Sequence, residues 1–445
     1  MWAALANLNV MKIDVGYTER LQGTLDPPSS KNYTTRYLLA AALAEGQSLV
    51  RRPARSDDAD ALVRCLRDLG AVIEESDDDD GARCLRVTGF GRTPKPCSVL
   101  NPGNAGAVAR FLMGTAALLP EVRFETDYAD SLGRRPHSEV LDALEQLGAT
   151  TESAEDGRFP LTIRGGNLQG GLVRLSGARS SQFLTSILFL APLIGEDVEI
   201  EITDNLVSKP LVATSLEVLA RAGIEVEATD DLMHFKIAAG QSYQPAEYNV
   251  NGDYPSAAAL LSAAVATGGD VTVRRLFEDS QGERAVIELL QRMGVQLSYD
   301  GSQVEVRGHD GLRGVEFNGD TATDMVLVML PLAAMATGES RFHGIGNLRL
   351  KECDRIAVPV RELGRLGVDC EEKEDEIIIR GNPSGYEGGI EIGTHHDHRV
   401  AQMLTIMGLR CRQGLVLNEA ETVSKSYPDF YDDLTQLGAQ IGERP

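Results

Sequence analysis

Residues 255–273 read PSAAALLSAAVATGGDVTV, and this stretch shows the pattern that decides the fold. Its first thirteen residues carry no polar side chain other than Ser and Thr, so a helix formed by them has no charged face. A helix that is apolar on all sides is stable only when it is buried. The glycine pair then ends the helical pattern, and DVTV predicts a strand.

The same pattern, an apolar helix followed by a strand, recurs along the chain. The apolar stretches are residues 34–46, 107–119, 181–195, 255–269, 324–339 and 399–414. A second pattern alternates with the first, and it consists of an amphipathic helix, a glycine and a β-branched strand. The glycines of this second pattern, 71 to 78 residues apart, are Gly70, Gly148, Gly223, Gly294, Gly367 and Gly438. Glycine after a last helical turn is the expected C′ residue, because a positive φ costs it little.

Each repeat therefore supplies one buried helix, one amphipathic helix and strands that can cover them. Helices inside a coat of sheets fit this pattern better than a doubly wound sheet does. A period above fifty residues is too long for an ordinary solenoid. We predict an α/β protein of two similar globular halves, with three repeats in each half.

Composition narrows the function. The formal net charge of −23 disfavours nucleic acid and anionic membranes as partners, because both need a basic face. No window approaches the roughly twenty apolar residues of a membrane helix, and the first twenty residues lack the pattern of a signal peptide. The six cysteines are scattered, as in proteins of a reducing cytoplasm. We expect a cytoplasmic protein, and we interpret the acidic run 74–80 as a loop between strands.

Polar residues stand at the start of each apolar stretch. They include Lys31, Arg36, Gly106, Arg110, Ser180, Ser181, Gln182, Asp253, Asp320, Asp324, His398 and Arg399. Ser and Asp are ordinary helix caps. Capping does not explain the cations, because the helix dipole disfavours positive charge at an N-terminus. Helix N-termini bind small anions, so these residues indicate an enzyme whose cleft binds phosphorylated, carboxylated small molecules.

Ten segments, in this order, carry a resemblance to a known family. They are SSKNYTTR (29–36), NPGNAGAVAR (101–110), SLGRRP (131–136), SSQFLTS (180–186), NLVSKP (205–210), NGDYPSAA (251–258), TDM (323–325), GNLRLKECDR (346–355), HHDHR (395–399) and VSKSYPDF (423–430). The chain resembles the 5-enolpyruvylshikimate-3-phosphate synthases from about Gly23 to Pro428. The resemblance implies two inside-out α/β domains, residues 1–28 with 252–445 and residues 29–251, with the active site in the interdomain cleft.

The resemblance also implies a reaction. The 5-hydroxyl of shikimate 3-phosphate adds to C2 of phosphoenolpyruvate while C3 is protonated, and the tetrahedral intermediate then loses phosphate. It assigns proton transfer to Asp324, Glu352 and Lys31. Shikimate 3-phosphate would contact Lys31, Asn32, Arg36, Ser180, Ser181, Gln182, Ser208, Asp324, Asn347 and Lys351. Phosphoenolpyruvate would contact Lys31, Gly106, Arg135, Gln182, Arg355, Arg399 and Lys425. No metal and no organic cofactor is implied, and we expect a monomer.

The chain departs from the family pattern at several of these segments. The departures are Asn32, Ala107, Phe111, Leu211 and Cys353, which replace residues that the family more often has. Asn32 removes a hydroxyl from the expected phosphate site, although its amide can donate instead. These changes bear on the binding of shikimate 3-phosphate more than on the chemistry.

Three other functions compete with this one. The first is enolpyruvyl transfer to UDP-N-acetylglucosamine or another acceptor, suggested by the pair Lys31-Asn32, although that sister enzyme lacks the motifs KE-x-DR and HDHR. The second is a metal-dependent hydrolase built on His395, His396 and His398, whose spacing cannot place ligands at i and i+4 on one helix face. The third is an anion-binding protein without activity, which the retained acidic and basic residues disfavour.

Overall fold

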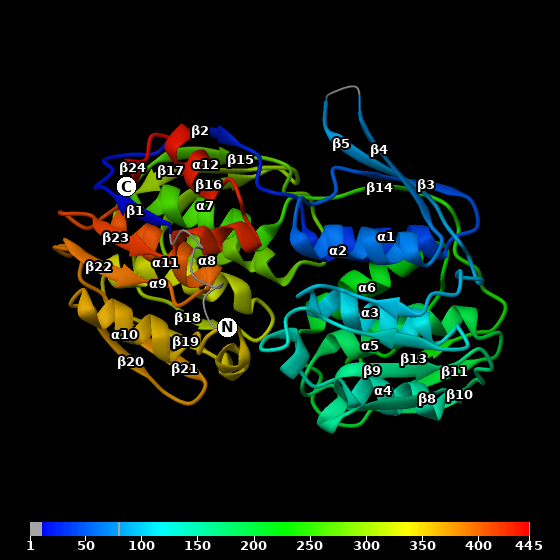
Figure 1. Cartoon of the computed structure of the whole chain (residues 1–445). Coiled ribbons are helices and arrows are strands. Elements are labelled where there is room, and N and C mark those ends of the chain that lie inside the picture. Colours follow the sequence, from blue (N-terminus) through cyan, green and yellow to red (C-terminus); the bar gives the residue numbers. More distant parts are fainter. Residues whose placement is uncertain (1–10, 79–80, 445) are drawn as a thin grey trace, which may run out of the picture. The chain divides into compact units, whose positions relative to one another are not determined.

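The computed structural model describes residues 11–78 and 81–444 (Figure 1). Within these residues the chain divides into two compact units, residues 11–28 with 252–444 and residues 29–251 without the gap at 79–80. The first ten residues, on which the expected absence of a signal peptide mainly depends, lie outside the described part. No helix within the described ranges is both long enough and apolar enough to cross a membrane.

The predicted apolar helices are present and buried among the described residues. They are α1 (Lys31–Leu43), α3 (Gly106–Ala116), α5 (Ser181–Leu190), α7 (Tyr254–Ala266), α9 (Thr323–Met335) and α11 (His398–Gly408). In α7 every residue is buried, and in α9 all but Asp324 and Met335 are. The hydrophobic pattern alone therefore located the core of each unit correctly.

The amphipathic helices also follow the predicted pattern. They are α2 (Asp57–Asp68), α4 (Ser138–Gln146), α6 (Lys209–Arg221), α8 (Val286–Arg292), α10 (Ala357–Arg365) and α12 (Phe430–Gln436). The six repeat glycines all have φ between +77° and +103°, the left-handed region that suits glycine at C′. Short 3-10 segments are η1 (Leu132–Arg134), η2 (Glu155–Gly157), η3 (Ala191–Leu193), η4 (Gly282–Ala285), η5 (Gly346–Leu350) and η6 (Ala420–Lys425).

The described strands of the first unit form three four-stranded sheets. In spatial order they are β22 (Ile390–Gly393), β23 (Leu415–Asn418), β1 (Lys12–Val15) and β24 (Ile441–Arg444); β16 (Val295–Tyr299), β17 (Val304–His309), β15 (Asp270–Val273) and β2 (Gln22–Leu25); and β18 (Glu316–Asn318), β19 (Glu339–His343), β21 (Glu376–Arg380) and β20 (Asp369–Glu372). The chain's first strands, β1 and β2, thus complete two sheets whose other strands come from the C-terminal half. This pairing makes the unit discontinuous in sequence.

The second unit repeats this arrangement with its own described strands. Its sheets are β10 (Gly171–Leu175), β11 (Val198–Ile202), β13 (His234–Ile237) and β12 (Glu227–Ala228); β14 (Glu247–Asn249), β3 (Gln47–Arg51), β5 (Arg83–Thr88) and β4 (Val72–Asp77); and β6 (Val99–Leu100), β7 (Val122–Phe124), β9 (Arg158–Arg164) and β8 (Thr150–Ala154). In every sheet of the described chain one parallel pair is followed by two antiparallel pairs. The repeat seen in the sequence is therefore a repeat of topology.

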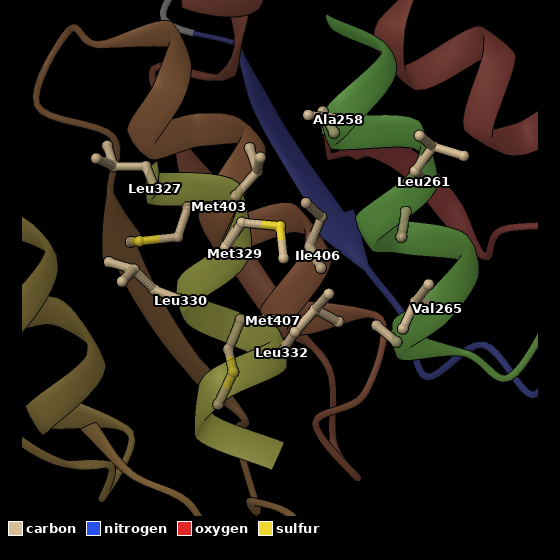
Figure 2. Packing of buried hydrophobic residues seen from close by; sticks show 14 of the residues in the cluster. Ala258, Leu261, Val265, Leu327, Met329, Leu330, Leu332, Met403, Ile406 and Met407 are labelled. Carbon is tan, nitrogen blue, oxygen red and sulfur yellow. The ribbon is translucent and has the colours of Figure 1, made fainter. Parts of the chain in front are cut away.

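Figure 2 shows the interior of the first unit. Side chains of α7, α9 and α11 interdigitate, and Leu261, Leu330 and Ile406 are among those with no exposed area. Because these helices are buried and mainly apolar along their length, the charged groups lie at the helix ends.

Three local predictions were wrong. Residues 74–77 belong to strand β4 and Asp78 follows it, whereas Asp79 and Asp80 lie outside the described residues. Acidic side chains on the exposed face of a strand are solvated as well as in a loop. Asp320 does not open α9, whose N-cap is Ala322. Lys31 begins α1 rather than preceding it, and Arg36 lies in its second turn.

Candidate active site

In the first unit, the predicted residues gather around the guanidinium group of Arg355. This side chain is 2% exposed and forms ion pairs with Asp397 at 2.8 Å, Glu352 at 2.8 Å and Asp324 at 3.2 Å. Burial alone would lower the pKa of Arg355, but the three carboxylates outweigh burial and raise it. Arg355 therefore acts as a fixed cation that ties the start of α9 to the start of α11.

Asp397 fixes the first turn of α11. Its Oδ1 accepts hydrogen bonds from the backbone N–H of Arg399 at 2.8 Å and of Val400 at 3.4 Å. Its carboxylate also accepts two hydrogen bonds from Arg355, from Nε at 2.8 Å and from Nη2 at 3.2 Å. The side chain is fully buried. A single carboxylate thus caps a helix and orients a guanidinium group.

The two predicted proton-transfer carboxylates of this unit are both held ionised. Burial favours a higher pKa for Asp324, but Lys351, Arg399 and Arg355 outweigh burial and hold the pKa well below its usual range. Burial likewise opposes ionisation of Glu352, and the charges of Arg355 and Lys425 hold its pKa below the usual range. Lys425 contacts Glu352 directly. Both carboxylates are therefore proton acceptors at neutral pH.

Arg399 is the other buried cation of this unit. It is 4% exposed, donates from Nη1 to Gln402 Oε1 at 3.0 Å, and keeps its Nε–H without a partner. Next to it, burial and the positive charges of Arg399 and Arg355 hold the pKa of His398 well below its usual value, so the imidazole is neutral. A guanidinium with unused donors beside a neutral histidine is suited to an anionic ligand.

The other histidines of residues 394–399 point to separate partners. His395 Nε2 lies 2.9 Å from Glu362 Oε1, and His396 Nε2 lies 3.1 Å from Glu419 Oε1. Both histidines have φ of 55°, in the left-handed region. Among residues 11–78 and 81–444, no group of three or more His, Cys, Asp or Glu side chains is placed to hold a metal ion. These histidines hold the loop before α11.

The remaining predicted residues of this unit lie on η5 and just after it. Asn347 belongs to η5 and its Oδ1 is buried without a hydrogen-bond partner. Lys351 follows η5, is exposed, and contributes the largest favourable charge acting on Asp324. An unused amide oxygen and an exposed ammonium group can both contact a polar ligand.

In the second unit, Arg36 is buried and forms no ion pair with any carboxylate of the described residues. It is 1% exposed and donates to Ser215 Oγ at 2.8 Å, Asn32 O at 3.0 Å and Leu211 O at 3.2 Å. Its guanidinium carbon lies 5.1 Å from the centre of the Phe111 ring. Burial lowers the pKa of Arg36 to about 10. A buried guanidinium with only neutral partners is a site for an anion.

Lys31 stands at the first position of α1, five residues before Arg36. Its Nζ lies 3.0 Å from Asp58 Oδ2, and 35% of its side chain is exposed. An ammonium group at this helix start opposes the dipole, and Asp58 offsets part of that cost.

A second cation connects α3 with α5. Arg110 donates from Nη1 to Gln182 Oε1 at 2.7 Å and to Ser180 Oγ at 3.3 Å, and its Nε–H is buried without a partner. Burial lowers the pKa of Arg110 to about 10. Ser180 is also the N-cap of α5, and Ser181 is the buried first residue of that helix. Arg110 therefore fixes two residues that the sequence assigned to substrate.

At Gly106 and Ser208 the backbone, rather than a side-chain contact, is the notable feature. A Cβ on Gly106 would lie 2.8 Å from Nη1 of Arg135, so glycine lets this guanidinium group approach the start of α3. Ser208 is the N-cap of α6 and has φ of 54°, which is unusual for a serine. Its side chain makes no capping hydrogen bond.

The departures from the family pattern are built into these contacts. The Phe111 ring lies beside the guanidinium group of Arg36, and this group donates a hydrogen bond to the carbonyl oxygen of Leu211. The thiol of Cys353 lies 3.5 Å from Asp397 Oδ2. Asn32 contributes its backbone oxygen to Arg36. Of these residues, Phe111 contacts a buried cation through its side chain, whereas Asn32 and Leu211 contact Arg36 through backbone oxygens.

The structure places the predicted residues in two groups, one in each unit. Sequence reasoning gave no substrate role to Arg110, although its position at a helix start marked it as unusual. It also did not identify Asp397 as the partner of Arg355. That pairing joins positions 42 residues apart, and no local pattern signals it.

Replacing Asp397 tests this arrangement. Asp397→Asn keeps the volume but leaves the buried Arg355 with less negative charge around it, so we expect a loss of about 3–5 kcal/mol in unfolding free energy. Urea denaturation measures the change. Asp14→Asn is the control, because Asp14 pairs with Arg444 on the surface with 48% exposure of each side chain, and such pairs contribute about 0–1 kcal/mol. Equal losses in the two variants would contradict the account.

The family model of EPSP synthase (3-phosphoshikimate 1-carboxyvinyltransferase) matches residues 15–434 of this chain. The 3-phosphoshikimate 1-carboxyvinyltransferase of Deinococcus radiodurans is 44% identical over 422 residues, which cover 95% of this chain and 94% of the relative. The same enzyme from Burkholderia pseudomallei is 36% identical, with 96% and 95% covered.

A solved structure is similar as well. EPSP synthase from Acinetobacter baumannii superimposes with a TM-score of 0.85 at 26% identity, covering 98% of this chain and all of that one.

Proposed function

The chain belongs to the EPSP synthase family, the 3-phosphoshikimate 1-carboxyvinyltransferases, and on this premise we propose how its residues carry out the reaction. It is a transferase of the shikimate pathway of aromatic amino-acid biosynthesis, and it moves the enolpyruvyl group of phosphoenolpyruvate to shikimate 3-phosphate. We propose that both groups of residues described above act in this reaction. We also propose that the enzyme acts as a cytoplasmic monomer without a cofactor.

The observation that carries the proposal is the set of buried guanidinium groups without a carboxylate partner. Within the described residues, Arg36, Arg110 and Arg399 form no ion pair, and the last two keep a buried N–H unused. Burying a charge without an opposite charge is costly. The two substrates bring two phosphates and two carboxylates, which supply that charge with bidentate geometry.

The chemistry has two steps. In the first, the 5-hydroxyl loses its proton to Asp324, its oxygen bonds to C2 of phosphoenolpyruvate, and C3 gains a proton. In the second, C3 returns a proton, the C2–O bond to phosphate breaks, and the vinyl ether and phosphate are formed. We assign donation of the proton to C3 to the Lys31 ammonium group and removal of a proton from C3 in the second step to the ionised Glu352 carboxylate. We assign charge stabilisation of the phosphates and carboxylates to the arginines.

The electrostatics of the free protein explain how Asp324 becomes a base only when it is needed. The cations Lys351, Arg399 and Arg355 lower its pKa. When phosphate and carboxylate groups bind to these cations, their effect on Asp324 is partly neutralised, and its proton affinity rises. Substrate binding therefore strengthens the base that the reaction uses.

The identity of the acceptor is tested by phosphate release. We expect release from phosphoenolpyruvate with shikimate 3-phosphate, with no effect of a chelator, and none with UDP-N-acetylglucosamine. Turnover only with the sugar nucleotide would assign the chain to the sister reaction. Loss of activity in chelator would restore the metal-dependent interpretation of residues 394–399.

The role of Asp324 is tested by Asp324→Asn. The variant keeps the size of the side chain but cannot accept the hydroxyl proton, so kcat should fall by about 10²–10⁴-fold. Steady-state phosphate release measures the change. Asp320→Asn is the matched control, because Asp320 is exposed and lies before α9, and it should retain the wild-type rate. A wild-type rate for Asp324→Asn would remove Asp324 from the mechanism.

A further inference from the structure

The short segment Gln281-Gly282-Glu283 connects the first turns of two buried helices. Gln281 is 4% exposed; its Oε1 accepts from the backbone N–H of Tyr254 at 3.0 Å, and its Nε2 donates to Gly252 O at 3.0 Å. Glu283, two residues later, accepts through Oε1 from the backbone N–H of Asp324 at 3.4 Å. Neighbouring side chains of one segment thus hold the starts of α7 and α9.

The start of α9 needs a group of this kind. Its N-cap is Ala322, which has no side-chain acceptor. By contrast, Asp253 caps α7, Asp397 caps α11 and Ser180 caps α5 with their own side chains. The first N–H groups of a helix lack partners within the helix. Glu283 supplies the acceptor for α9 from a position 41 residues earlier in the chain.

The charges around Glu283 give the carboxyl groups of Glu283 and Asp324 different protonation states. Burial and the charge of Asp324 raise the pKa of Glu283 to about 8, with Asp253 acting in the same direction and Arg399 opposing. The adjacent Arg284 pairs with Glu278 at 2.9 Å. At neutral pH Glu283 is therefore protonated while Asp324 is ionised.

We propose that Glu283 is a positioning residue for the reaction: from η4 it holds the first turn of α9 and thereby sets the direction of the Asp324 carboxylate. The proposal rests on the proposed function, in which Asp324 accepts the hydroxyl proton. When Glu283 is neutral, Asp324 alone carries the negative charge of these two carboxyl groups. If Glu283 ionises, a second negative charge stands beside Asp324 and weakens the binding of anionic substrates.

Three variants test the positioning role. Glu283→Ala removes the acceptor for the Asp324 N–H, and kcat at pH 7 should fall by about 10–100-fold, because small displacements of a reacting group have effects of this size. Glu283→Gln keeps a neutral acceptor and should restore kcat to within about threefold of wild type. Glu288→Ala, at an exposed position of α8, is the control and should match wild type.

The pH dependence of kcat/KM distinguishes the positioning role from a purely structural role. In the wild type, kcat/KM for the anionic substrates should fall as pH rises through about 8, where Glu283 ionises. In Glu283→Gln no such ionisation exists, and this part of the decline should be absent. A wild-type kcat for Glu283→Ala, an equal loss in Ala and Gln variants, or identical pH profiles of wild type and Glu283→Gln would overturn the proposal.

Thermal unfolding supplies a readout that does not depend on activity. The unfolded chain releases the Glu283 proton near pH 4.5, whereas the folded protein keeps it until about pH 8. The folded state therefore loses stability as pH rises through this range. The melting temperature of the wild type should fall relative to that of Glu283→Gln between pH 5 and 8. Parallel curves would overturn the proposal even if Glu283→Ala failed to fold.

The same measurements separate this proposal from the proposed function. If Asp324→Asn turned over normally, the role of Asp324 would be wrong, whereas the melting curves would still report the state of Glu283. If Asp324→Asn were inactive and the Glu283 variants behaved like wild type in every assay, only the positioning role would fail.

Discussion

A helix that is buried along its whole length can present polar groups to a ligand only at its ends. This constraint determines where chemistry can occur in both units. Hydrophobic side chains of α7, α9 and α11 pack together in the interior of the first unit (Figure 2). The residues with unusual charge or unused donors therefore lie in first and second turns, as Arg36, Arg110 and Arg399 do.

The two units balance the charge of their buried arginines in different ways. In the first unit, Arg355 is balanced by three carboxylates, one of which also caps α11. This cluster sets the geometry of the site before any ligand arrives. In the second unit, Arg36 and Arg110 have only neutral partners, and burial lowers the pKa of both. The negative charge that they lack is the charge that the substrates carry. One unit is thus organised mainly by internal ion pairs, and the other is poised to receive an anion.

Sequence reasoning predicted the fold well because the decisive signals are local and repeated. The apolar helices and the repeat glycines follow from hydrophobic pattern and from the backbone freedom of glycine, and both are confirmed. It predicted less of the site because ion pairs and caps can join distant positions. Asp320 seemed a natural start for α9, yet the acceptor at that start comes from Glu283. Nothing near Glu283 in the sequence indicates this role, since its segment is short and has no periodicity.

The central claim is that buried cations without carboxylate partners are the binding sites for the substrate anions, and calorimetry of shikimate 3-phosphate binding to Arg36→Met tests it most directly. Methionine keeps much of the apolar stem but removes the charge. The account predicts that affinity falls by at least about tenfold, while the melting temperature stays equal or rises, because an unbalanced buried charge has been removed. Arg221→Met, at a half-exposed arginine of the same unit, should bind like the wild type. Wild-type affinity in Arg36→Met would contradict the claim.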